Sequence, residues 1–120
     1  AIQVGQKNGK LAMNGRSVFS FSATVVPKNI LAMLKLNDLT IDDIDLFALH
    51  QGSRYIVTTI NQRLGITDAK SPFVAAAYGN TVSSSIPVLL KDSAAEFERV
   101  VIAGFGVGLS WASTVLYKVD

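Results

Sequence analysis

Leu46-Phe47-Ala48-Leu49, followed directly by His50, is the stretch that decides the fold. Four apolar residues without alternation are typical of a strand that is buried on both faces, as in a parallel sheet. A helical pattern follows at once, because Ile56, Ile60 and Leu64 recur at the spacing of one helix face. A buried strand followed by an amphipathic helix predicts an α/β architecture, with His50 at the carboxyl end of the strand.

The segments on either side of this strand are expected to be mainly helical. Residues 61–63 are polar and are predicted to face solvent, and Gly65 follows as a helix stop. Before the strand, residues 15–36 carry apolar residues at helical spacing, and Pro27 is expected to bend or break that helix. Residues 1–14 are interpreted as an irregular or edge segment.

Acidic residues mark a short helical turn just before the strand. Thr40 and, three residues later, Asp43 form a capping signal. Asp42, Asp43 and Asp45 are interpreted together as a solvated helix start, where the helix dipole favours negative charge.

The second half of the chain is expected to add three strands and one helix. Residues 72–77 and 97–104 are predicted strands, and a turn at residues 78–80 leads into a helix that ends near Leu90. A glycine-broken turn at residues 104–108 precedes a last strand over residues 109–117. The order is α-β-α-β-α-β-β, which predicts a mostly parallel sheet with an antiparallel closing hairpin.

Length and composition favour one folded domain over residues 1–120. The chain has 120 residues, of which 49% are hydrophobic and 17% charged, where about a quarter is usual, so it is not disordered. The net charge is only +2 and the basic residues are scattered, which argues against nucleic-acid binding. No apolar run approaches the roughly 18 residues of a membrane span, so we expect no membrane association and a cytoplasmic location.

The absence of cysteine restricts the chemistry available to these residues. A disulfide scaffold, a thiolate metal site and a cysteine nucleophile are all excluded within this stretch. The single histidine, His50, has its nearest carboxylate at Asp45, so no metal site is predicted.

Three conspicuous features fall at the carboxyl ends of predicted strands. They are His50, Asn80 and the glycine turn after Gly104, and in an open parallel sheet such ends meet at one site. Each also has a structural interpretation: a core histidine, a helix N-cap, and a tight hairpin with positive φ angles. The turn alternatively presents backbone N–H groups to a developing oxyanion. Its spacing and the following strand exclude a dinucleotide fingerprint.

A serine hydrolase is a further alternative. Ser83, Ser84 and Ser85 with His50 suggest a hydrolase, but the sequence has no G-x-S-x-G elbow, which disfavours that interpretation.

Four segments together resemble a known family. They are MNGRSVF at residues 13–19, HQGS at 50–53, YGNTVSSSIP at 78–87 and GFGVGLSW at 104–111. In this order and spacing they resemble the carboxyl-terminal half of beta-ketoacyl-acyl-carrier-protein synthase III, a thiolase-fold condensing enzyme. The resemblance spans nearly the whole chain and implies a thiolase-like α/β half.

The resemblance implies that this chain is one part of a larger catalyst. An amino-terminal half would supply the nucleophilic cysteine, and these residues alone would be inactive. An exposed apolar face would receive that half and a second subunit, so a homodimer is expected.

The resemblance also assigns roles to individual residues. The substrates would be an acyl-coenzyme A and a malonyl thioester, with no further cofactor. His50 and Asn80 would donate hydrogen bonds to the enolate oxygen, and the backbone N–H of Val107 would donate a hydrogen bond to the acyl oxygen. Gly15 and Phe19 would lie near the mouth of the pantetheine tunnel.

The helix after His50 departs from the family pattern H-Q-A-N-x-R-I. The asparagine position is Ser53, and the arginine position expected to dock an acyl carrier protein is Tyr55. Arg54 and Arg63 are the basic residues left for that docking. Three alternatives therefore stay open: a specialised secondary-metabolite enzyme that uses coenzyme A thioesters, a non-catalytic binding or assembly domain, and an unrelated small enzyme with His50 as base beside a carboxylate.

Overall fold

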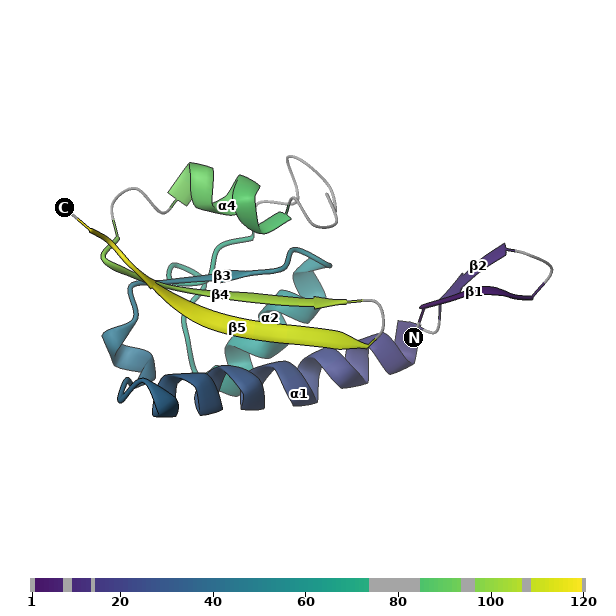
Figure 1. The fold of residues 1–120 in the computed structure, drawn as a ribbon, viewed down its shortest axis with the longest axis horizontal. Coiled ribbons are helices and arrows are strands. Elements are labelled where there is room, and N and C mark those ends of the chain that lie inside the picture. The colour runs from purple at the N-terminus through teal and green to yellow at the C-terminus, as the bar shows by residue number, and fades with distance from the viewer. Residues whose placement is uncertain are drawn as a thin grey trace.

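The computed structural model describes residues 2–7, 10–13, 15–73, 85–93, 97–106 and 109–119 (Figure 1). Its elements, in chain order, are β1 (Ile2–Lys7), β2 (Lys10–Met13), α1 (Gly15–Leu36), the 3-10 helix η1 (Ile41–Asp43), β3 (Leu46–Leu49), α2 (Arg54–Leu64), α4 (Ser85–Ser93), β4 (Arg99–Gly106) and β5 (Ser110–Tyr117).

Strands β3, β4 and β5 form one mixed sheet in that order. β3 pairs with β4 in parallel, with Leu49 opposite Ala103, and β4 pairs with β5 in antiparallel fashion. The predicted α/β class and the antiparallel closing hairpin are confirmed. Within the described residues the sheet has one parallel and one antiparallel pair, because the further strand predicted over residues 72–77 falls mainly outside them.

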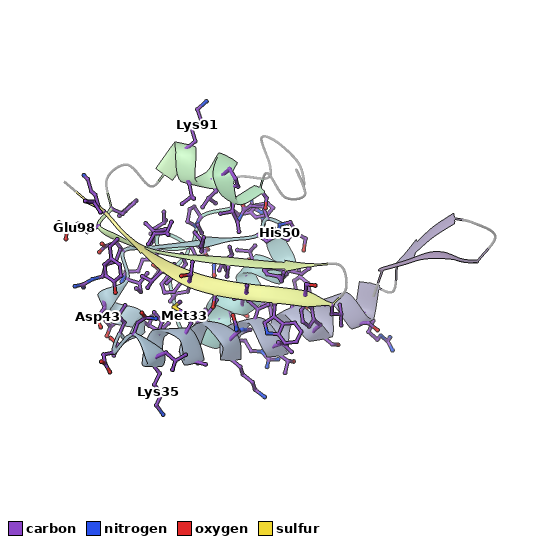
Figure 2. The ribbon with its side chains drawn as sticks, viewed as in Figure 1. Met33, Lys35, Asp43, His50, Lys91 and Glu98 are labelled. Atoms are coloured by element: carbon purple, nitrogen blue, oxygen red, sulfur yellow. The ribbon has the colours of Figure 1, made fainter. Side chains whose placement is uncertain are left out.

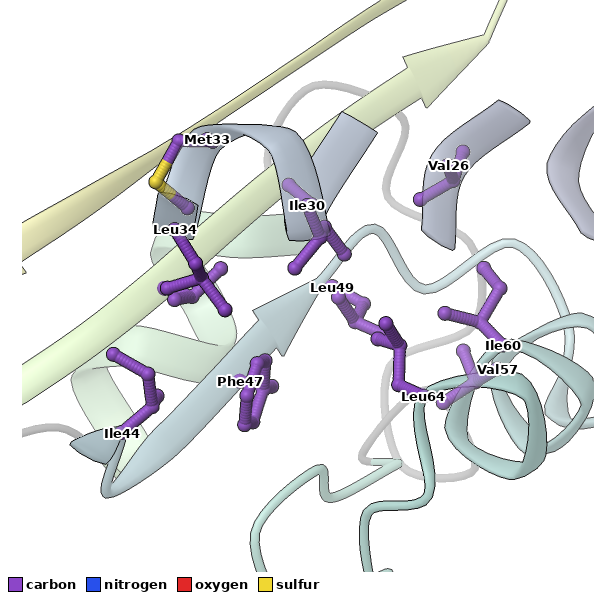
Figure 3. Packing of buried hydrophobic residues seen from close by; sticks show 12 residues of the cluster. Val26, Ile30, Met33, Leu34, Ile44, Phe47, Leu49, Val57, Ile60 and Leu64 are labelled. Carbon is purple, nitrogen blue, oxygen red and sulfur yellow. The ribbon is translucent and has the colours of Figure 1, made fainter. Parts of the chain in front are cut away.

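The sheet lies between two helical layers. In Figure 1, α1 and α2 lie on one side of it and α4 on the other. Alternate residues of β3 face the two sides: Phe47 and Leu49 join the cluster with α1 and α2 (Figure 3), whereas Leu46 and Ala48 belong to a second cluster with Leu89 of α4. This two-sided burial explains why the strand is apolar without alternation.

Helix α1 continues through Pro27, so the predicted break is wrong. A proline inside a helix removes one backbone hydrogen bond and costs about 3 kcal/mol. Buried residues on both sides of it, Val26 and Ile30 among them, pack against the sheet and α2, and this packing stabilises the continuous helix. The helix ends where predicted, with the Asn37 side-chain amide donating to the carbonyl of Met33 at 2.8 Å.

Helix α2 ends at the predicted stop, Gly65, and begins after Ser53, a cap that was not predicted. The Ser53 hydroxyl accepts the backbone N–H of Ile56 at 3.1 Å, and Gly65 ends the helix with a left-handed φ of 71°. The expectation that Asn61 faces solvent is wrong, because its side chain is only 3% exposed. Its amide donates to the carboxylate of Asp68 and the carbonyl of Ser71, both at 3.4 Å, and ties the following loop to the helix.

The acidic segment before β3 has two separate roles. η1 is the predicted short helical turn, with the backbone N–H of Thr40 donating to Asp43 at 2.8 Å. This hydrogen bond holds the pKa of Asp43 below its usual value. Asp45 is not part of the helix start: its carboxylate accepts the backbone N–H groups of Glu98 and Arg99, at 3.2 and 3.0 Å, and anchors the beginning of β4.

Residues 2–7 and 10–13, within the segment expected to be irregular or an edge, form two strands. Strands β1 and β2 pair in antiparallel fashion, with Lys7 opposite Lys10, and their hairpin stands apart from the three-stranded sheet in Figure 1.

Two properties of the described residues concern membrane spanning and metal binding. No described helix is both long and apolar enough to cross a bilayer. No group of three or more His, Cys, Asp or Glu side chains among the same residues is arranged to hold a metal ion.

Candidate functional site

His50 lies where β3 and β4 end and α4 begins. Its backbone N–H donates to the carbonyl of Ala103 at 2.9 Å, which continues the parallel pairing one residue beyond β3. Figure 2 shows His50 at this end of the sheet, on the side of α4. The predicted place of His50 at the carboxyl end of a parallel strand is therefore confirmed.

The imidazole of His50 is half-buried between a hydroxyl and an aromatic ring. Its Nδ1 lies 2.6 Å from Oγ of Ser85, the first residue of α4. The ring of Phe105 on β4 meets it edge-on, with centroids 5.3 Å apart. Burial lowers the pKa of His50 below the ordinary 6.5, so the ring is neutral near pH 7. Within the described part of the chain, no carboxylate is hydrogen-bonded to the ring.

Ser85 is the site residue whose role sequence reasoning missed. The sequence suggests it only as a nucleophile. In the structure its hydroxyl is buried against Nδ1 of His50 and also accepts the backbone N–H of Gln51 at 3.4 Å. Ser83 and Ser84 lie outside the described residues. The role of Ser85 could have been predicted from its place near a helix start, at the end of the sheet where His50 was expected.

Gln51 and Gly52 shape the loop between His50 and α2. Gln51 is almost fully buried, and its side-chain amide donates to the carbonyl of Leu49 at 2.9 Å and to that of Pro72 at 3.4 Å. A Cβ atom added at Gly52 would lie 3.7 Å from Cδ2 and 3.8 Å from Nε2 of His50. Gly52 therefore adjoins the Cδ2–Nε2 edge of the imidazole.

Two aromatic contacts flank the start of α2. Phe19, on the first turns of α1, stacks on Tyr55 with ring centroids 5.0 Å apart. The guanidinium of Arg54 lies 4.7 Å from the centroid of Phe73. Gly15 is the first residue of α1. Tyr55 is 70% exposed, so one face of this aromatic pair is open to a ligand.

The two arginines expected to dock a carrier protein do not share a surface. Arg54 begins α2 and Arg63 is in its last turn. At about 100° per residue, nine residues place them on opposite sides of the helix. Both are exposed, but Arg54 already contacts Phe73 through its guanidinium.

Two residues of the predicted site lie outside the described residues. They are Asn80 and Val107, so their convergence with His50 stays a prediction. The predicted extent of the glycine turn is wrong: Gly104 and Gly106 belong to β4, and among the described glycines only Gly65 has a positive φ. Strand pairing with β5 continues to Gly106 opposite Ser110 and holds both glycines extended.

Comparison with known proteins identifies the class to which this fold and site belong. Residues 34–118, more than half of the chain, match the family model described as 3-oxoacyl-(acyl-carrier-protein) synthase III C terminal. The chain belongs to this family, and the predicted resemblance to a thiolase-fold synthase III half is confirmed.

Individual relatives agree with the family. The chain is 37% identical over 120 residues to the beta-ketoacyl-acyl-carrier-protein synthase III of Lactococcus lactis subsp. cremoris MG1363, covering 94% of this chain and 37% of that protein. It is 34% identical over 113 residues to the enzyme of that name from Streptococcus uberis, covering 88% of this chain and 35% of that protein. The chain thus spans little more than a third of these curated relatives.

Solved structures match the fold closely. The synthase III of Thermus thermophilus superposes with a TM-score of 0.89 at 32% identity, over 98% of this chain and 41% of that one. The priming beta-ketosynthase of the R1128 polyketide pathway superposes with a TM-score of 0.79 at 31% identity, over 92% of this chain and 35% of that one. Family membership excludes the alternative of an unrelated small enzyme, and the ring of His50 lacks the carboxylate that alternative requires among the described residues.

Proposed function

We propose that this chain is the carboxyl-terminal part of an acyltransferase that joins an acyl thioester and a malonyl thioester by decarboxylative Claisen condensation. The observation that carries the proposal is the placement of His50, half-buried at the end of β3, in a member of the synthase III family.

The reaction would proceed in two stages. A cysteine thiolate of the amino-terminal part attacks the acyl-coenzyme A carbonyl and releases the coenzyme A thiolate. The malonyl thioester then loses carbon dioxide, and the electron pair of the broken bond forms an enolate. The enolate carbon attacks the acyl-cysteine carbonyl, a carbon–carbon bond forms, and the cysteine thiolate leaves.

His50 and Asn80 would stabilise the enolate oxygen by hydrogen bonding. A neutral imidazole with a proton on Nε2 is such a donor, and the lowered pKa of His50 supports the neutral form. Loss of one preorganised donor of this kind costs about 100- to 1000-fold in turnover. Val107 would direct its backbone N–H at the acyl oxygen.

An uncovered face of the sheet supports the presence of an amino-terminal half. Gly104 faces Ile86 of α4, so Gly106, two residues on, shares that side of β4, and no atom lies within 4 Å of a Cβ added there. On β5, Ala112 and Thr114 alternate with Ser113, which bonds to α1, and both are exposed. Small side chains permit close approach of another helix. We propose that the cysteine-bearing half packs there.

The first turn of α2 supports a route for the thioester arm past Phe19 and Tyr55. Tyr55 presents an uncharged ring where the family pattern has arginine, and the Arg54 guanidinium is placed over Phe73. These contacts favour coenzyme A thioesters over an acidic carrier protein. A carrier-dependent enzyme and a homodimer remain predictions to be tested on the complete gene product.

The test uses the complete gene product, whose intact mass is measured before and after incubation with acetyl-coenzyme A. We expect a product well above 12.8 kDa that gains one acyl group. Malonyl-thioester decarboxylation is then compared for His50→Ala and Asn80→Ala, with Lys35→Ala, an exposed position on α1, as control. Undiminished decarboxylation in both site variants would refute the proposal. A product of 12.8 kDa that is never acylated would favour the binding-domain alternative.

A further inference from the structure

We infer that Ser85 is a positioning residue, whose hydroxyl donates its proton to Nδ1 of His50 and so holds the imidazole in the tautomer with the proton on Nε2. This inference rests on the proposed function, because only that tautomer can donate a hydrogen bond to an enolate oxygen on the Nε2 side.

The contact is short and partly buried. Oγ of Ser85 lies 2.6 Å from Nδ1 of His50, and Ser85 is only 3% exposed. The residues involved are 35 positions apart and lie on α4 and at the end of β3. The hydrogen bond thus joins one helical layer directly to the functional end of the sheet.

A second hydrogen bond favours donation by the hydroxyl. The backbone N–H of Gln51 donates to the same Oγ at 3.4 Å and occupies one of its lone pairs. A hydroxyl that accepts one hydrogen bond becomes a better donor for the next, because the two bonds polarise each other. The single hydroxyl proton is then directed at Nδ1.

The surroundings of the ring also favour a bare Nδ1. A carboxylate would draw the imidazole proton to the nitrogen that faces it, but within the described residues Nδ1 is bonded to a hydroxyl and to no carboxylate. The half-buried ring is neutral and has one N–H to place. Nε2 lies on the other side of the ring from Nδ1, on the edge that adjoins Gly52.

Nitrogen NMR tests the tautomer without reference to activity. The complete gene product is labelled with 15N-histidine, and the His50 signals are identified by their loss in His50→Gln. We expect long-range 1H–15N correlations to show a protonated Nε2 and a bare Nδ1. Ser85→Ala should give a mixture of tautomers, and Ser85→Thr, which keeps a hydroxyl, should restore the original pattern. A proton on Nδ1 in the unaltered protein, or an unchanged spectrum in Ser85→Ala, would overturn the inference.

Kinetics separate positioning from folding and from the proposed reaction itself. In Ser85→Ala, kcat for malonyl decarboxylation should fall about 10- to 100-fold, the range known for removing a hydrogen-bond partner that orients a metal-ligating histidine, with little change in KM. Cysteine acylation, followed by intact mass, should be unaffected, and Ser85→Thr should recover most of the loss. Lys91→Ala, an exposed position on the same helix, is the matched control (Figure 2). An equal loss of acylation and decarboxylation would indicate a merely structural serine. If the unaltered protein shows the Nε2–H tautomer but neither reaction, the proposed function fails while the assigned hydrogen bond stands.

Discussion

The ring of Tyr55 lies nearly parallel to the ring of Phe19, with centroids 5.0 Å apart and planes inclined by 13°. This pair joins the first turn of α2 to the amino-terminal part of α1. Because Tyr55 is 70% exposed, its side chain contributes little to stability. We expect its exposed ring to influence which thioester binds at the site.

Replacing Tyr55 by arginine should change the choice of thioester. Tyr55→Arg restores the positive charge of the family pattern and should raise kcat/KM for a malonyl-carrier thioester by up to about fivefold, the range of an exposed ion pair. The gain should shrink at high salt, whereas kcat/KM for malonyl-coenzyme A should change little. Tyr55→Phe, which keeps the stacked ring, is the control. An equal gain with both thioesters would show that carrier charge is not what this position senses.

The Ser53 cap should stabilise α2 measurably. Ser53→Ala removes the acceptor for the Ile56 N–H and should lower the free energy of unfolding by about 1 kcal/mol in urea titrations at fixed protein concentration. Ser53→Asn, which matches the family pattern, should be close to neutral because asparagine caps equally well. Gln62→Ala, an exposed change in the same helix, controls for helix propensity. A loss of similar size in Gln62→Ala would remove the cap as the explanation.

Two glycines should respond to alanine in opposite directions. Gly52→Ala places a Cβ at ordinary contact distance from the His50 ring and reduces the freedom of the unfolded chain, so it should stabilise by about 0.4–1 kcal/mol. Gly65→Ala forces a side chain into left-handed backbone at φ 71° and should destabilise by about 1 kcal/mol. Unfolding midpoints of the two variants give the comparison. Destabilisation by Gly52→Ala would mean that the loop after His50 needs glycine for its backbone.

Burial of His50 should make stability depend on pH. The pKa of His50 is lowered from 6.5 in the folded state, so the unfolded chain takes up this proton at a higher pH than the folded chain does. The contribution to stability is complete above the unfolded value and is lost as pH falls through the folded value. Between about pH 7.5 and about pH 5.5 the unaltered protein should lose more unfolding free energy than His50→Gln. Parallel losses in both proteins would contradict a lowered pKa.

Local sequence signals were sufficient for the elements that surround the site. The apolar run before His50, the Gly65 stop of α2 and the Thr40–Asp43 capping signal all lie within a few residues of the structure they determine. Pro27 was misleading, because propensity alone does not include the packing that holds α1 together on both sides of it.

The contacts that define the site join residues that are far apart in the sequence, so no local sequence pattern predicts them. Ser85 meets His50 across 35 residues, and its hydroxyl takes that role only because α4 begins beside the end of β3. Asn61 was misplaced for a similar reason: the loop that follows α2 folds back over it and supplies the carbonyl of Ser71 as a partner. Polarity indicated an exposed side chain, and tertiary structure provides two acceptors for its amide nitrogen, whereas its Oδ1 is buried with no hydrogen-bond partner among the described residues.

The Asp45 carboxylate fixes more than the start of β4. It binds the N–H groups of Glu98 and Arg99, while at the far end of the same strand pair His50 bonds to Ala103. A slip of one residue between β3 and β4 would break both attachments and turn alternate side chains to the wrong side of the sheet. Asp45 lies at the opposite end of β3 from His50. By fixing the register of β3 against β4, its carboxylate also fixes the position of the imidazole along the sheet.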